Sequence, residues 1–110
     1  MTSREERIGL NEAVFREVNE RIGELAETFD LKSEALDLVC ECGDASCVQP
    51  ITMLHSDYEQ VRSDSNHFAV FPGHEMPDVE RIVAKRKGYD VVEKHEGVPQ
   101  MVAEQTDPRT

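Results

Sequence analysis

The sequence predicts an α+β fold, in which a long amphipathic N-terminal helix accompanies a small antiparallel sheet. Two observations predict this class. Apolar residues recur at helical spacing through the first thirty residues, and short segments of β-rich or alternating character follow, with Pro-Gly and Lys-Gly turns between some of them. With 110 residues, the chain is long enough for one domain and too short for two independent ones.

The N-terminal helix is expected over residues 1–30. Ser3 and Glu6 have the spacing of a capping box, in which each side chain satisfies a free backbone amide of the other residue. Seven residues after this cap alternate in steps of three and four, and we call them the helix seam: Ile8, Asn11, Phe15, Val18, Ile22, Leu25 and Phe29. Such a seam is typical of a helix that packs along a line.

Two kinds of partner suit the helix seam. A second helix, from another copy of the chain or from another protein, would pair along it, with Asn11 setting the register. Packing on the domain's own core is the alternative, and three further apolar residues that widen the stripe favour it: Leu10, Ala13 and Val14. The charged residues beside the seam are expected to be solvated: Glu12, Arg16, Glu20 and Arg21.

Residues 31–97 are expected to form the main body of the domain after a linker at 29–33. Strands are expected at 36–42, 50–54 and 67–71, followed by a hairpin of strands 79–86 and 89–94. A helix is the alternative for residues 79–86. A second capping box at Ser56 and Glu59 predicts a helix that ends by residue 65. Residues 98–110 are expected to be a tail with one helical turn.

The composition is strongly acidic, and this excludes several partners. The net charge of −11 would repel nucleic-acid phosphates and anionic lipids, and the basic run Lys85-Arg86-Lys87 is too short to overcome it. No segment approaches the ~20 apolar residues of a membrane span. The N-terminus lacks the apolar core of a signal peptide, so we expect a cytoplasmic protein that binds neither nucleic acid nor membranes.

All three cysteines lie in the segment CECGDASC, residues 40–47. Clustered thiols in a reducing cytoplasm are more typical of a metal site than of disulfides, and a disulfide between Cys40 and Cys42 would close a strained ring. Gly43 is expected to adopt a positive φ that turns both sulfurs toward one ion. The sequence therefore predicts Zn²⁺ bound by Cys40, Cys42 and Cys47.

Zinc usually takes a fourth ligand, and the histidines are the candidates. His74 is preferred, because it follows a Pro-Gly turn on a loop next to an apolar strand. His67 and His55 are the alternatives, while His95 is expected at the surface. A site of Cys40, Cys42, Cys47 and His74 would staple the small α+β domain, whose core is short of aromatic residues.

The pattern C-x-C-G-x3-C of residues 40–47 resembles the post-SET zinc knuckle, which follows histone lysine methyltransferase domains. The resemblance implies zinc ligation by Cys40, Cys42 and Cys47, with a fourth ligand from a distant segment. It implies no methyltransferase activity, because nothing else in the chain is similar to a SET domain. The chain as a whole is similar to small uncharacterised bacterial proteins with a CxCGxxxC…PGHE pattern, and this likeness implies no activity.

These features together predict a zinc-binding protein that acts as a protein-interaction or regulatory module through its N-terminal helix, its acidic surface or both. A zinc-thiolate switch that senses oxidants is one alternative. A zinc-dependent hydrolase with an open metal position is the other, with Glu75 or Glu41 as the nearby carboxylate. The chain has no H-E-x-x-H motif and no deaminase signature, so no catalytic residue is assigned.

Overall fold

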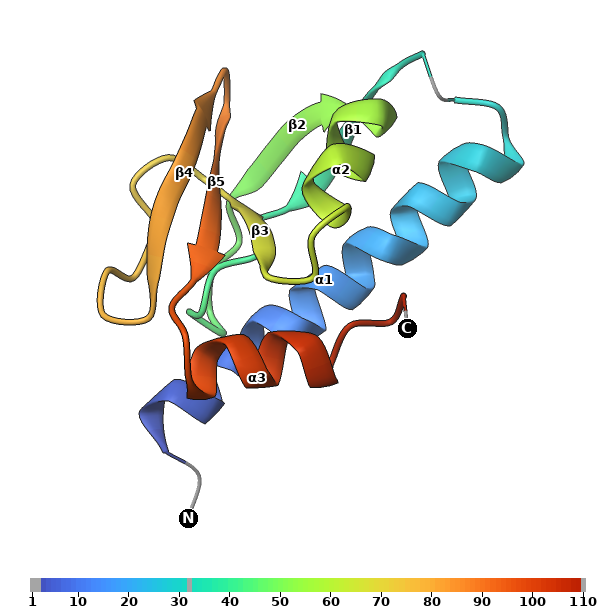
Figure 1. The fold of residues 1–110 in the computed structure, drawn as a ribbon. Helices are drawn as coiled ribbons and strands as arrows, with labels where there is room; N and C mark the ends of the chain where they lie inside the picture. The colour runs from blue at the N-terminus through green and yellow to red at the C-terminus, as the bar shows by residue number, and fades with distance from the viewer. Residues whose placement is uncertain (1–2, 32, 110) are drawn as a thin grey trace.

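The computed structural model has an α+β fold, as the sequence predicts, with a long N-terminal helix and small antiparallel sheets (Figure 1). The structure describes residues 3–31 and 33–109, so the parts of the predicted segments at 1–2, 32 and 110 lie outside the described residues. The elements are α1 (Arg4–Thr28), β1 (Ala35–Val39), β2 (Pro50–Leu54), α2 (His55–Arg62), β3 (His67–Val70), β4 (Glu80–Arg86), β5 (Tyr89–Lys94) and α3 (Val98–Gln105).

The strands form two small antiparallel sheets. β1 pairs with β2, with Ala35 opposite Leu54 and Val39 opposite Pro50. The second sheet has the order β3-β5-β4, and its β4–β5 hairpin turns at Gly88, whose φ of 91° is a conformation that glycine adopts readily. The backbone amide of Glu41, two residues after β1, donates a 2.8 Å hydrogen bond to the carbonyl of Ala69 in β3. This bond joins the end of β1 to the second sheet.

The core lies between the two sheets and α2. Alternate residues of β1 and β2 point into it, because successive side chains of a strand face opposite sides. They are Leu36 and Leu38 of β1 and Ile51 and Met53 of β2. The other large core side chains come from α2, β3 and β5: Tyr58, Val61, Phe68, Val70 and Val92.

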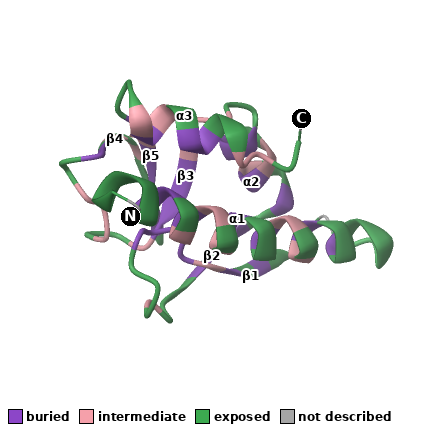
Figure 2. Ribbon diagram, turned by 90° about the horizontal axis from the view of Figure 1, so that it is seen from below, coloured by how far each residue is buried: buried purple, intermediate pink, exposed green. Residues whose placement is uncertain are grey.

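Helix α1 lies across this body, and α3 packs against its N-terminal half (Figure 1; Figure 2). The Ser3 hydroxyl caps α1 by accepting a 3.1 Å hydrogen bond from the Glu6 amide, as predicted. The face that α1 buries is unexpectedly polar, since Glu12, Arg16 and Asn19 are all 0% exposed. The expectation that Glu12 and Arg16 are solvated is therefore wrong.

Buried partners from distant segments explain why these polar residues point inward. Lys94 Nζ donates to Glu12 at 2.6 Å and to Glu80 at 2.9 Å, which places one cation between two carboxylates. Arg16 donates 2.8 Å hydrogen bonds to the carbonyls of Ser65 and Ala103. Its guanidinium also lies 4.4 Å from the centre of the Phe68 ring. Hydrogen bonding and ion pairing thus replace apolar contact on this face.

The helix seam is divided between the core and the solvent. Ile8 is buried, whereas Val18, Leu25 and Phe29 are 41%, 57% and 68% exposed. Leu10 and Val14 are also exposed, so the expectation that they pack on the core is wrong. The last turns of α1 extend beyond the sheets and carry part of this exposed surface (Figure 2).

Three further details differ from the expectations. Ser56 does not cap α2, because the helix begins at His55 and its N-cap residue is Leu54. β1 ends at Val39, so the cysteines lie on a loop. Residues 98–105 form α3, with Pro99 in its first turn, where its missing amide hydrogen costs nothing.

Among the described residues, no helix combines the length and the apolar character needed to cross a membrane.

Candidate metal centre

Four side chains that the sequence singled out lie together in the structure: Cys40, Cys42, Cys47 and His74. Their potential ligand atoms all lie within 4.8 Å of one another. Nδ1 of His74 is 3.6 Å from Sγ of Cys47 and 3.8 Å from Sγ of Cys40. These four residues could therefore hold a metal ion.

The other histidines lie elsewhere. His55 begins α2 and faces two glutamates. His67 forms a 3.0 Å hydrogen bond with Glu93. His95 is exposed, as expected. Of the candidates for a fourth ligand, the structure thus brings His74 to the thiols.

The loop after β1 brings the three cysteines together. Asp44 forms an Asx turn in which its carboxylate accepts hydrogen bonds from the Ser46 amide, at 2.9 Å, and the Ser46 hydroxyl, at 2.7 Å. The Cys47 amide donates to the Asp44 carbonyl at 3.0 Å. This tight turn reverses the chain directly after Cys42 and brings Cys47 back beside it.

The P-G-H-E loop positions His74 from the other side. Gly73 has a φ of 88°, and the His74 amide donates a 2.9 Å hydrogen bond to the Phe71 carbonyl, so the turn is closed. The Phe71 ring packs against the imidazole at 5.1 Å between centroids. The Phe71 amide also donates to Cys40 Sγ at 3.1 Å, which supports negative charge on that sulfur.

Gly43 has a different role from the one expected. Its φ is not positive, so the backbone conformation does not demand glycine. Glycine is needed here because the space is too small for a side chain. A Cβ at this position would overlap Cγ2 of Ile8 and lie 3.0 Å from Sδ of Met76. Asn11 donates a 2.9 Å hydrogen bond to the Gly43 carbonyl. The first turns of α1 therefore lie directly against the cysteine loop.

Glu41 separates the first two thiols and anchors the loop in the core. It is 0% exposed, and its carboxylate accepts hydrogen bonds from Asn19 at 2.8 Å, from the Tyr58 hydroxyl at 2.7 Å and from the Ala69 amide at 3.0 Å. Burial raises the pKa of Glu41, and these hydrogen bonds oppose the rise. The carboxylate is thus used by the fold and is not free to act on a substrate.

Sequence reasoning missed Asn19 and Tyr58 as supports of the cysteine loop. Asn19 also holds the end of β1, since it donates to the Val39 carbonyl and accepts from the Val39 amide, both at 2.8 Å. Asn19 lies in a helix rich in charged residues, and nothing in the sequence around it indicates a contact with the cysteine loop. Only the partner atoms, which lie about twenty residues away, reveal its role.

The thiols influence one another's protonation. The hydrogen bond from Cys40 lowers the pKa of Cys42 to about 5, and the same bond, with burial, raises the pKa of Cys40. Burial also raises the pKa of Cys47. All three cysteines are free of disulfides. Three cysteine sulfurs, which bind metals as thiolates, and an imidazole nitrogen are the donor set that borderline and soft divalent cations prefer.

The protein was compared with known proteins in three ways. No protein-family model matches the chain, and the searches of curated proteins and of solved structures found no match.

Proposed function

We propose that Cys40, Cys42, Cys47 and His74 bind one Zn²⁺ and that this ion is structural. The carrying observation is the separation of the donor atoms. With Zn–S of about 2.3 Å, Zn–N of about 2.05 Å and tetrahedral angles, a sulfur and a nitrogen ligand lie about 3.6 Å apart. His74 Nδ1 lies 3.6 and 3.8 Å from two of the sulfurs. These two separations suit a tetrahedral shell.

A structural role is favoured over a catalytic one because four side chains fill a tetrahedral shell and leave no position for water. Cys40 and Cys42 are buried, and Glu41 is held in the core. The ion would join the loop after β1 to the loop after β3, so its binding energy would contribute to folding.

Native mass spectrometry of protein expressed without added metal tests this assignment. We expect one zinc per chain, lost in Cys47→Ser and kept in Val48→Ala, a control at the exposed neighbouring residue. Removal of zinc by a chelator should unfold the domain, as followed by circular dichroism. A folded, metal-free wild-type protein with an unchanged spectrum would refute the assignment.

We further propose that the metal-stapled domain is an interaction module in which α1 pairs with α1 of a second copy. The observation behind this is the exposed part of the helix seam, Val18, Leu25 and Phe29, which continues the half-buried Phe15 and Ile22. The 3-4 spacing of these residues suits self-complementary helix pairing. The seam from residue 15 to 29 covers only about 21 Å of helix, so the dimer would be weak and reversible.

Sedimentation at several protein concentrations tests the pairing. We expect a monomer–dimer equilibrium that Val18→Asp abolishes and Val83→Asp leaves intact, since Val83 has a matching exposure of 43% on β4. Added salt should strengthen the dimer, because it screens repulsion between two chains of charge −11. A protein that stays monomeric at millimolar concentration would refute self-association and leave a different protein as the partner of α1.

A further inference from the structure

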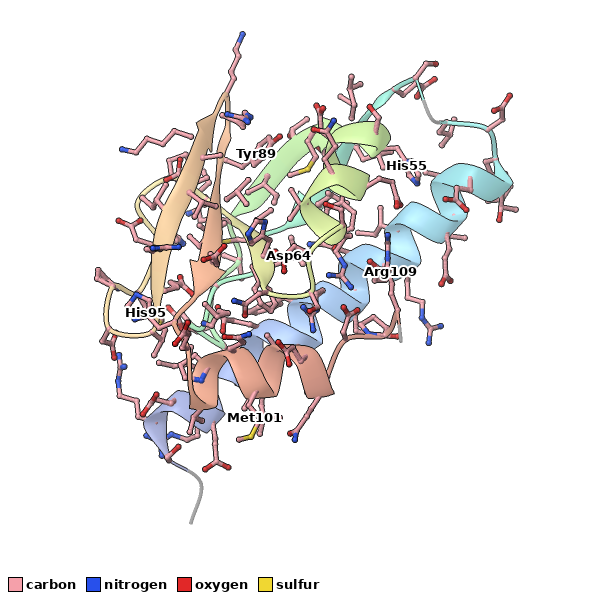
Figure 3. The ribbon with its side chains drawn as sticks, in the orientation of Figure 1. His55, Asp64, Tyr89, His95, Met101 and Arg109 are labelled. Carbon is pink, nitrogen blue, oxygen red and sulfur yellow. The ribbon has the colours of Figure 1, made fainter. Side chains whose placement is uncertain are left out.

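A second group of potential ligands lies away from the cysteines, between the C-terminal part of α1 and the start of α2: Glu27, His55 and Glu59. His55 and Glu59 are four residues apart on α2, so their side chains share one face of that helix. Glu27 comes from the last turn of α1. Figure 3 shows His55 between these two helices. Their ligand atoms lie within 4.8 Å of one another.

The imidazole of His55 is buried but lacks a hydrogen-bond partner at Nε2 among the described residues. The residue is only 6% exposed. Nε2 lies 3.2 Å from Glu27 Oε1 and 3.5 Å from Glu59 Oε1, yet neither oxygen completes a hydrogen bond with it. Such an orphaned polar atom is costly unless something absent from the protein chain satisfies it.

The described residues contain one other group of a histidine with two carboxylates. His67 also faces two carboxylates, Asp64 and Glu93. Its Nε2 forms a 3.0 Å hydrogen bond with Glu93, and Arg81 binds the other oxygen of Glu93 at 2.7 Å. The Nε2 atom of His67 therefore has a hydrogen-bond partner. The orphaned nitrogen distinguishes the His55 group.

The atom separations suit a shared metal ion. A nitrogen and an oxygen that each lie about 2.0–2.1 Å from one first-row ion, at angles between 90° and 110°, are about 2.9–3.4 Å apart. The separation of 3.2 Å between His55 Nε2 and Glu27 Oε1 lies in this range, and that to Glu59 is 0.1 Å outside it. These are distances at which two ligands can share an ion although they do not hydrogen-bond to each other.

The electrostatic surroundings favour a cation. A hollow of about 270 Å³ adjoins the group and is lined by four glutamates, Gly23 and Arg109. The glutamates are Glu20, Glu24, Glu27 and Glu59. α1 has no basic residue in its last turn, so the negative end of its dipole lies uncompensated at this position.

Arg109 lowers the affinity of Glu27, His55 and Glu59 for a cation, but it does not block these ligands. Its guanidinium binds both oxygens of Glu59, at 2.7 and 2.9 Å, and also reaches Glu20 at 2.9 Å. Figure 3 shows Arg109 on the same side of the molecule as His55. The Glu59 oxygen nearest His55 accepts one hydrogen bond from Arg109 and keeps lone-pair capacity for an ion.

We propose that Glu27, His55 and Glu59 form a second, open site for a divalent first-row transition cation such as Mn²⁺. One imidazole and two carboxylates suit these ions, and water from the adjoining hollow would complete the coordination shell. The bound ion would satisfy His55 and join the end of α1 to α2. This site does not depend on the occupancy of the cysteine centre.

Titration with Mn²⁺, followed by electron paramagnetic resonance of the free ion, tests the proposal. The protein is loaded with one equivalent of zinc, which prefers the thiolates, and Mn²⁺ prefers oxygen and nitrogen ligands, so the cysteine centre does not compete. We expect saturable binding of one Mn²⁺ per chain. Glu27→Gln, at a half-exposed residue that should not affect folding, should weaken binding at least about tenfold.

Three further variants separate a built site from a diffuse acidic surface. Glu24→Gln removes the same charge from the same hollow without removing a ligand, so we expect binding within about threefold of wild type. Glu59→Gln should weaken binding as Glu27→Gln does, and Arg109→Ala should strengthen it by freeing Glu59. Unsaturable binding, absent binding or equal losses in Glu24→Gln and Glu27→Gln would each overturn the proposal.

Discussion

Replacing Asn19 by alanine removes the side chain that ties α1 to the cysteine loop. Two of its hydrogen bonds pair with the Val39 backbone, and a third reaches the buried Glu41 carboxylate. Two neutral bonds contribute about 1 kcal/mol each, and one to a carboxylate about 1.5–3 kcal/mol. Alanine regains about 0.5 kcal/mol of helix propensity. The variant should therefore lose about 3–4.5 kcal/mol of unfolding free energy.

Urea unfolding of the zinc-saturated protein, followed by far-ultraviolet circular dichroism, measures this loss. With a slope of about 1–2 kcal/mol per M urea, the midpoint should fall by at least about 1.5 M. Glu17→Ala, at an exposed position of the same helix, is the control and should change the free energy by less than about 0.5 kcal/mol. A loss below about 1 kcal/mol in Asn19→Ala would show that the buried polar face of α1 does not hold the loop.

Three further predictions address other contacts. Gly43→Ala should cost about 1–3 kcal/mol of unfolding free energy because its Cβ overlaps Ile8, and a second change, Ile8→Ala, should reduce that penalty in the same urea assay. Tyr58→Phe should cost about 1–3 kcal/mol by leaving the buried Glu41 short of one donor, and a loss near zero would contradict this role. Arg109 lowers the pKa of Glu59 through its hydrogen bond, so the pair stabilises the fold above the ordinary glutamate pKa and loses that effect as the pH falls. Since Glu59 is partly exposed, wild type and Arg109→Ala should differ by about 0.5–1 kcal/mol at pH 7 and converge below pH 4, and a difference that grows in acid would refute the assignment.

Much of the fold could be predicted from local patterns. The strands and the β4–β5 hairpin follow from short β-rich segments and glycine turns, and the start of α1 follows from the Ser3 cap. The four clustered side chains could be predicted because metal-ligand residues are few in this chain and His74 lies on a turn after a core strand.

The orientation of α1 could not be predicted in the same way. Apolar spacing indicates the buried face only when apolar contact drives the packing. Here Glu12, Arg16 and Asn19 are buried because Lys94, backbone carbonyls and Glu41 meet them, and these partners come from segments up to 87 positions away. The role of Gly43 was missed for a related reason, since the atom that excludes a side chain belongs to Ile8, in a different element.

The polar face of α1 also limits how this helix can move. Apolar side chains can slide past one another at little cost, but hydrogen bonds and ion pairs need particular partners at particular distances. A shift of α1 by one turn, about 5.4 Å, would separate Glu12, Arg16 and Asn19 from all of their partners at once. The helix is therefore fixed in rotation and in position along its axis. A partner that docks at Phe29 would therefore meet a helix whose position is already set.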